Sequence, residues 1–228
     1  MSDEGESVDC ELCLSLEWSS EGSRVVSQAY STSRQIVDES ELQLVIDASP
    51  MVVGHMLIVT TRHVTSLRDG SGTNLETALQ RIINAYQSIF KKCTIVCHQS
   101  PSNAVQEGTG PCVDHAHWHL LPFAGELNKV LLSDNMGSHV IVPHWRDFLN
   151  PKYARQECLF YWDGEAARVV EHPNLPYKQY ARSLVGRVIG TEPALWDWAV
   201  ESNSVNFQAT REFTNQLQCL FRSDGEYR

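Results

Sequence analysis

The segment His115-Ala116-His117-Trp118-His119-Leu120-Leu121 decides how this chain folds and where its chemistry lies. On a β-strand successive side chains point to opposite faces, so the three histidines share one face. The apolar residues between them then point the other way, into a core. Three of the nine histidines fall within five residues, and packing alone does not account for that. The segment predicts a strand with imidazoles along one side.

Three kinds of site use imidazoles in this arrangement. The first is a solvated run of histidines on a polar strand face. The second is a metal site, because histidine is a common metal ligand and alternate strand positions suit a catalytic zinc. The third, which we favour, is covalent catalysis at phosphorus. Imidazole is a good nucleophile near neutral pH, and neighbouring imidazoles can bind phosphate oxygens and protonate a leaving group.

The rest of the chain predicts an α+β sheet with helices on one face, plus a mainly helical C-terminal extension. A hairpin is expected where two β-prone runs flank Asp47-Ala48-Ser49-Pro50, and an amphipathic helix where apolar residues recur at helical spacing after Asn74. The expected strands are 42–46, 51–60, 93–97, 114–121, 158–162 and 166–170, and the expected helices are 75–90, 177–189 and 205–221. We divide the chain into a disordered tail (1–9), a first domain (10–125) and an extension packed on it (126–228).

The amino-acid composition indicates which binding partners and which cellular compartment to expect for this protein. A net charge of -10 disfavours nucleic acid as a partner. No apolar run approaches the roughly 20 residues of a membrane helix, and the acidic N-terminus does not have the pattern of a secretory signal. The seven cysteines are then expected as free thiols in a reducing cytoplasm, with Cys10 and Cys13 as a possible exception.

The triple histidine resembles the signature of the histidine triad superfamily, His-φ-His-φ-His-φ-φ with φ apolar, and fills every position. Upstream, Gly54-His55-Met56-Leu57-Ile58-Val59, followed by Arg62-His63 and Ser66, is similar to an earlier motif of that family. The resemblance covers roughly residues 10–122. It implies an antiparallel sheet with helices packed on it, and a homodimer. More loosely, Tyr180-Ala181-Arg182 and the residues after it look like the C-terminal helical tail of some bacterial-type members.

The resemblance also implies roles for single residues. His117 would be the nucleophile that forms a nucleotidyl-histidine intermediate, and His119 would bond the phosphate and assist the leaving group. Asp47 would lie near the nucleotide ribose, and His55 would support the triad. His98 stands where many members carry another polar residue at the substrate.

Cys10-Glu11-Leu12-Cys13 has the spacing of a zinc knuckle but needs two more ligands. One branch of the superfamily binds zinc with such a pair, with the histidine that ends the upstream motif and with the first triad histidine. Those positions are Cys10, Cys13, His63 and His115, so the resemblance implies a structural zinc. Two free thiols, or a redox pair, are the alternatives.

The expected function is therefore a nucleotide hydrolase or nucleotidyltransferase. Its substrate would be a small nucleoside phosphate ester, anhydride or phosphoramidate. One alternative is a metal-dependent enzyme that uses the triple histidine as ligands. The other is a non-catalytic nucleotide-binding protein.

Overall fold

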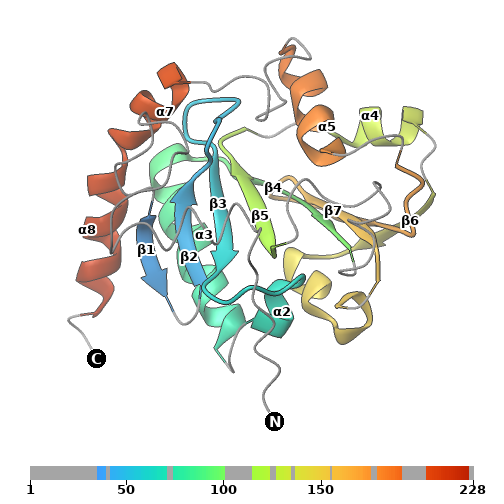
Figure 1. Cartoon of the computed structure of the whole chain (residues 1–228), viewed down its shortest axis with the longest axis horizontal. Helices are drawn as coiled ribbons and strands as arrows, with labels where there is room; N and C mark the ends of the chain where they lie inside the picture. The colour runs from blue at the N-terminus through green and yellow to red at the C-terminus, as the bar shows by residue number, and fades with distance from the viewer. Residues whose placement is uncertain are drawn as a thin grey trace.

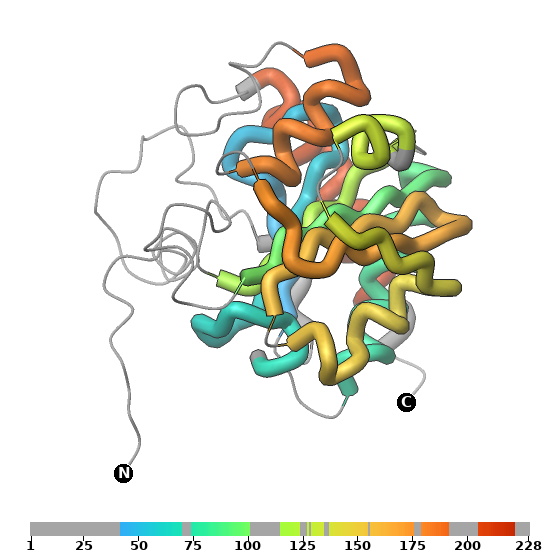
Figure 2. Tube along the Cα trace, turned by 90° about the vertical axis from the view of Figure 1, so that its right-hand side faces the viewer, coloured from blue at the N-terminus to red at the C-terminus, as the bar shows by residue number. Residues whose placement is uncertain are grey.

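The computed structural model describes residues 35–39, 42–70, 74–100, 115–123, 127–134, 137–154, 156–175, 179–191 and 204–225 (Figure 1 and Figure 2). The strands are β1 (Gln35–Glu39), β2 (Leu42–Ile46), β3 (Met56–Thr60), β4 (Thr94–Gln99), β5 (His117–Leu121), β6 (Ser138–Val142), β7 (Cys158–Trp162) and β8 (Ala167–Glu171). The α-helices are α2 (Leu67–Gly70), α3 (Leu75–Phe90), α4 (Leu127–Asp134), α5 (Tyr180–Ile189), α7 (Ser204–Arg211) and α8 (Thr214–Gly225), with 3-10 helices η2 (Trp145–Leu149) and η3 (Pro151–Tyr153). The expected tail, 1–9, lies outside the described residues.

All eight described strands form one sheet, in the order β1-β2-β3-β5-β4-β7-β8-β6. Every pairing of neighbours is antiparallel, which confirms the expected α+β fold with an antiparallel sheet. Strand β4 pairs with β5 on one side and with β7 on the other. The second half of the chain therefore adds three strands to the sheet that carries the histidines, in addition to its helices.

Two strands begin three or more residues later than the sequence predicts. The hairpin of β2 and β3 is confirmed, but β3 starts at Met56, and residues 51–55 form the turn before it. Gly54 lies in that turn with φ +90, a left-handed conformation that glycine adopts without a steric penalty. Strand β5 starts at His117, and His115 precedes it in an irregular segment. The backbone N–H of Ala116 donates there to the carbonyl of Val64, outside a regular ladder.

The helices follow the apolar periodicity, with one exception. Helix α3 has the predicted bounds, and its apolar face is buried. The predicted helix 205–221 is instead two helices, α7 and α8, separated by residues 212–213. Phe213 packs against Phe90 of α3 with ring centroids 5.0 Å apart, a tertiary contact that local periodicity does not report. Among the described residues no helix is long and apolar enough to span a membrane.

Helices cover both faces of the sheet, so the expectation of helices on one face is wrong. The larger core lies on the face that Trp118 joins, with residues of α2, α3, α7 and α8. A second core on the opposite face packs α4 and α5 against β4, β5, β7 and β8. Because side chains alternate along β5, the histidine face is the one that α4 and α5 cover. Figure 1 shows α3 behind the sheet and α5 at its upper end.

Candidate active site

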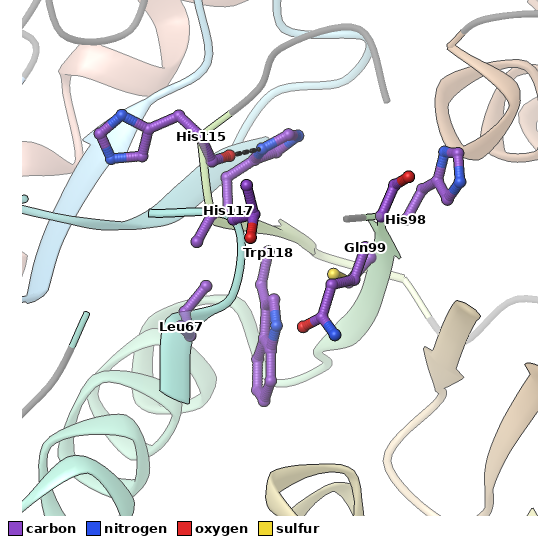
Figure 3. A pocket seen from close by; sticks show the side chains of 10 residues that line it. Leu67, His98, Gln99, His115, His117 and Trp118 are labelled. Carbon is purple, nitrogen blue, oxygen red and sulfur yellow. Dashed lines mark hydrogen bonds between the residues drawn. The ribbon is translucent and has the colours of Figure 1, made fainter. Parts of the chain in front are cut away.

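The three triad histidines are buried. His115, His117 and His119 are 2%, 6% and 3% exposed. Trp118 packs on the opposite side against Trp145, Phe148 and Phe160, and Figure 3 shows its ring pointing away from the histidine rings. Burial excludes the solvated strand face as an explanation of these residues. Aromatic packing on one side of β5 therefore holds the imidazoles on the other.

His117 is held in one tautomer by its own strand. Its Nδ1 lies 2.7 Å from the backbone oxygen of His115 (Figure 3). A carbonyl can only accept, so Nδ1 carries the proton and Nε2 keeps its lone pair. Burial lowers the pKa of His117 below its ordinary value, because desolvation disfavours the charged ring. His117 is thus a neutral imidazole with a nucleophilic Nε2.

A chain of hydrogen bonds assigns the opposite tautomer to His119. The backbone N–H of Met51 donates to Nδ1 of His55 at 3.2 Å, so the proton of His55 is on Nε2. That Nε2–H donates to Nδ1 of His119 at 2.9 Å, which leaves the His119 proton on Nε2. Burial lowers the pKa of His55 to about 4 and that of His119 well below its ordinary value. The pair is therefore neutral, and His119 presents an N–H donor.

Asp47 lies beside this pair but is held by the C-terminal half of the chain. Its Oδ2 is 3.6 Å from Nε2 of His55 and 3.9 Å from Nδ1 of His119. Nη1 of Arg182, in α5, donates to the same oxygen at 2.9 Å. The other oxygen, Oδ1, accepts from the backbone N–H of Ser49 at 2.8 Å. Both carboxylate oxygens thus have protein donors, and the residue is 4% exposed.

The contacts of Asp47 help to decide whether a metal ion could bind at this site or at the triad histidines. Asp47, His55 and His119 offer ligand atoms within 4.8 Å of one another, a spacing that a metal ion could bridge. The Arg182 guanidinium already supplies a positive charge to that carboxylate, which disfavours a further cation there. Among the residues that the structure describes, the three triad histidines do not form such a group. A metal-dependent enzyme with the triple histidine as ligands is therefore not supported.

His115 faces a different environment from the other two. Its Nε2 donates to the backbone oxygen of Thr60 at 2.8 Å, so Nδ1 is the unprotonated atom. The half-buried ring of His63 meets it edge-on, with centroids 5.3 Å apart. The structure thus brings together the two histidines that were predicted as zinc ligands, and the bond to Thr60 orients the ring of His115. Cys10 and Cys13, the other predicted ligands, lie outside the described residues.

His98 borders a cavity next to the triad. The lining residues are Thr65, Leu67, Cys97, His98, Gln99, Ser100, His115, Ala116, His117 and Trp118 (Figure 3). Nε2 of His98 lies 3.1 Å from Oε1 of Glu157, which precedes β7. The side-chain amide of Gln99 donates to the backbone oxygen of Tyr153. His98 and Gln99, the polar residues at the end of β4, are thus tied to the second half of the chain.

Two residues at this site were not predicted from the sequence. Arg182 stands in the quoted segment Tyr180-Ala181-Arg182, but an arginine on an amphipathic helix usually faces solvent. Its apolar neighbours Ala181 and Leu184 were the available signal. No feature of the sequence indicated that Glu157, which lies beside the predicted strand 158–162, would be at the site. Both contacts join segments far apart in the chain, and local patterns do not report such pairings.

The solved structures that are similar to this chain are distant from it. A HIT-like protein from Bartonella henselae is 23% identical, over 40% of this chain and 65% of that protein, with a TM-score of 0.30. A zinc-bound histidine triad family protein from Mycobacterium smegmatis is 18% identical, over 50% and 75%, with a TM-score of 0.32. Yeast Ap4A phosphorylase in complex with AMP is 13% identical, over 61% and 59%, with a TM-score of 0.38. No curated protein matches the chain.

The chain spans less than two thirds of the Bartonella and yeast proteins. The firmest comparison is with a family model: the HIT domain model matches residues 28–125. That range contains the three triad histidines, His55 and Asp47. The likeness of this chain to the HIT domain family is therefore carried by residues 28–125.

Proposed function

We propose that this protein is a nucleotide hydrolase or nucleotidyltransferase that works through a nucleotidyl intermediate on His117. The observation that carries this proposal is the pair of opposite tautomers on β5. His117 presents a lone pair at Nε2, whereas His119, on the same strand face, presents an Nε2–H. A nucleophile and an N–H donor side by side are what displacement at phosphorus requires.

In the first step Nε2 of His117 attacks the phosphorus of a nucleoside phosphate ester, anhydride or phosphoramidate. A nitrogen–phosphorus bond forms, and the bond from phosphorus to the leaving group breaks. The Nε2–H of His119 donates a hydrogen bond to the departing atom of the leaving group, which takes its proton from solvent. In the second step water or another acceptor attacks the phosphorus and loses its proton to solvent, while the same N–H keeps its proton. The bond to His117 then breaks, and the tautomers are restored.

The other predicted residues support this centre. His98 borders the cavity beside His117, where we assign it to the phosphate oxygens of the substrate. His55 orients His119, and Asp47 lies next to that pair. We retain a structural zinc held by Cys10, Cys13, His63 and His115, which would fix the segment that precedes β5. We also retain the homodimer that the family resemblance implies.

The test is turnover by His117→Ala. We expect a loss on the order of 10³-fold or more with the fold intact, because the covalent step is removed. His172→Ala is the matched control, since His172 is exposed. The substrates are adenylyl and guanylyl esters, dinucleoside polyphosphates and nucleoside phosphoramidates. A labelled nucleotidyl adduct on His117 supports the proposal. Full activity of His117→Ala contradicts the covalent step, and nucleotide binding without turnover by the wild type favours a binding protein.

A further inference from the structure

Arg182 places a positive charge in the interior next to the proposed catalytic pair. It lies in α5 and is 2% exposed. Nη1 donates to Oδ2 of Asp47 at 2.9 Å, and Nη2 donates to the backbone oxygen of Ser49 at 2.7 Å. Both bonds go to the turn that follows β2. The guanidinium therefore ends at the carboxylate that lies within 4 Å of His55 and His119.

The docking of α5 does not account for this arginine. Tyr180, Ala181, Leu184 and Val185 already bury the helix against the second core. Transfer of an arginine and an aspartate out of water is costly, and replacing such a buried pair by apolar residues is often neutral or stabilising. A second arginine of α5, Arg187, pairs with Asp134 near the surface, where its side chain is 38% exposed. Stabilisation of the fold therefore does not explain why Arg182 and Asp47 are buried together, and we look for another role.

The position of the carboxylate indicates that role. An uncompensated carboxylate 3.6 Å from Nε2 of His55 would attract the proton at that nitrogen and favour a charged imidazole. The His55 proton would then turn from His119 towards Asp47. With Arg182 in place the carboxylate is neutralised from its other side. The His55 proton stays on the bond to Nδ1 of His119, and Nε2 of His119 keeps its proton.

We propose that Arg182 is a positioning residue of the active site, which holds Asp47 so that the His55–His119 pair keeps the tautomer whose Nε2–H donates a hydrogen bond to the leaving group. This inference rests on the proposed function and deepens it, because it assigns the second half of the chain a part in the chemistry. Arg182 acts through Asp47 and His55 and does not contact the reacting atoms.

Two substrates separate this role from a general loss of structure. The p-nitrophenyl ester of AMP has a good leaving group that needs little help from a hydrogen bond, whereas the phenyl ester needs the N–H donor. We expect Arg182→Gln to lose about tenfold or more in kcat on the phenyl ester and much less on the p-nitrophenyl ester. Arg187→Gln, the matched control on the same helix, should stay within about twofold on both. Equal losses on the two esters for Arg182→Gln would overturn the inference.

A double variant tests charge compensation and guards against misfolding of the single variant. Asp47→Asn combined with Arg182→Gln removes both charges, so neither group is left buried and unpaired. We expect the double variant to recover much of the phenyl-ester activity that Arg182→Gln loses. A double variant that folds but is as impaired as the single variant contradicts the role of Arg182.

Nitrogen NMR of the imidazoles provides a readout that needs no turnover. We expect His119 in the wild type to be protonated on Nε2 only, with its signals assigned by comparison with His119→Gln. Arg182→Gln should alter the protonation of the His55–His119 pair, and Arg187→Gln should not. An unchanged pair in Arg182→Gln refutes the inference. If the wild type hydrolyses neither ester, the proposed function fails, while the NMR result still decides whether Arg182 sets the tautomer.

Discussion

Replacement of Gly54 by alanine tests how the turn before His55 is held. Gly54 has φ +90, and a Cβ atom there would lie 2.7 Å from Cε1 of Phe90 and 3.1 Å from Cγ of Pro122. The backbone is also fixed by two hydrogen bonds. The N–H of Gly54 donates to Oγ1 of Thr210 at 2.8 Å, and its carbonyl accepts from the hydroxyl of Tyr86 at 2.7 Å. The turn has little freedom to move away from the added methyl group.

The size of the effect follows from two contributions. An alanine in the left-handed region costs about 1–3 kcal/mol, and an extra methyl group in a packed interior costs about 1–3 kcal/mol. Movement of the turn to relieve the clash would break one or both hydrogen bonds, so relaxation saves little. We expect Gly54→Ala to lose about 4 kcal/mol of unfolding free energy. For a chain of this length that lowers Tm by roughly 8–16 °C.

The control is Gly190→Ala, measured by urea titration under the same conditions. Gly190 ends α5 with φ +71, but no heavy atom lies within 4 Å of its ideal Cβ position. It therefore carries the conformational cost without the clash, about 1–2 kcal/mol. The difference between the two variants isolates the crowding around Gly54. Equal destabilisation of both variants would refute the argument.

Three further predictions concern the core and the buried histidines. Trp118→Ala should cost about 3–5 kcal/mol of unfolding free energy in urea titrations, because it opens a cavity between three aromatic rings; a loss below about 1 kcal/mol would contradict that packing. Tyr86→Phe should cost about 1–3 kcal/mol by leaving the carbonyl of Gly54 without its donor, and thermal melts check this. Burial lowers the pKa of His55 from 6.5 to about 4, so the unfolded chain binds more protons in that window. Unfolding free energy should fall as pH drops from 6.5 towards 4, by on the order of 3 kcal/mol from this residue. His55→Gln should flatten that slope, and an unchanged slope would count against the burial argument.

The sequence predicts those helices and strands that are determined by a pattern within their own segment. Alternation along β5 places His117 and His119 on one side of the strand and Trp118 in the core on the other. The apolar period after Asn74 predicts α3 with its observed bounds. The hairpin of β2 and β3 follows from two β-prone runs around a turn. In each case the pattern and its physical cause lie within one short segment.

Long-range pairing is what the sequence does not reveal. The run 158–162 is recognisable as a strand, but nothing in it indicates that it pairs with β4 and extends the sheet of the triad. Arg182 is similar, because its helix is predictable and its aspartate partner, 135 residues away, is not. The burial of the triad belongs to the same class, since α4 and α5, which cover that face, come later in the chain.

The turn between β2 and β3 connects the second half of the chain to the proposed active site. This turn carries Asp47 and leads to His55, and two later helices hold it. Helix α5 does so through Arg182. Helix α7 does so through Thr210, bonded to Gly54, and through the side chain of Asn206, which donates to the carbonyl of Pro50 at 3.0 Å. In Figure 1 and Figure 2 the turn lies at the same end of the molecule as both helices.

In the proposed mechanism, residues 28–125 supply the nucleophile and the N–H donor, and we infer that elements beyond residue 126 fix the tautomer and position of the groups behind the donor. Strand β5 can present His117 and His119 without help, because alternation along the strand places both on one face. It cannot determine which nitrogen of each ring holds the proton. That depends on partners of the rings, and for His119 the partners extend through His55 and Asp47 to Arg182. Changes in α5 should therefore alter leaving-group dependence even where the strand that carries the triad is unchanged.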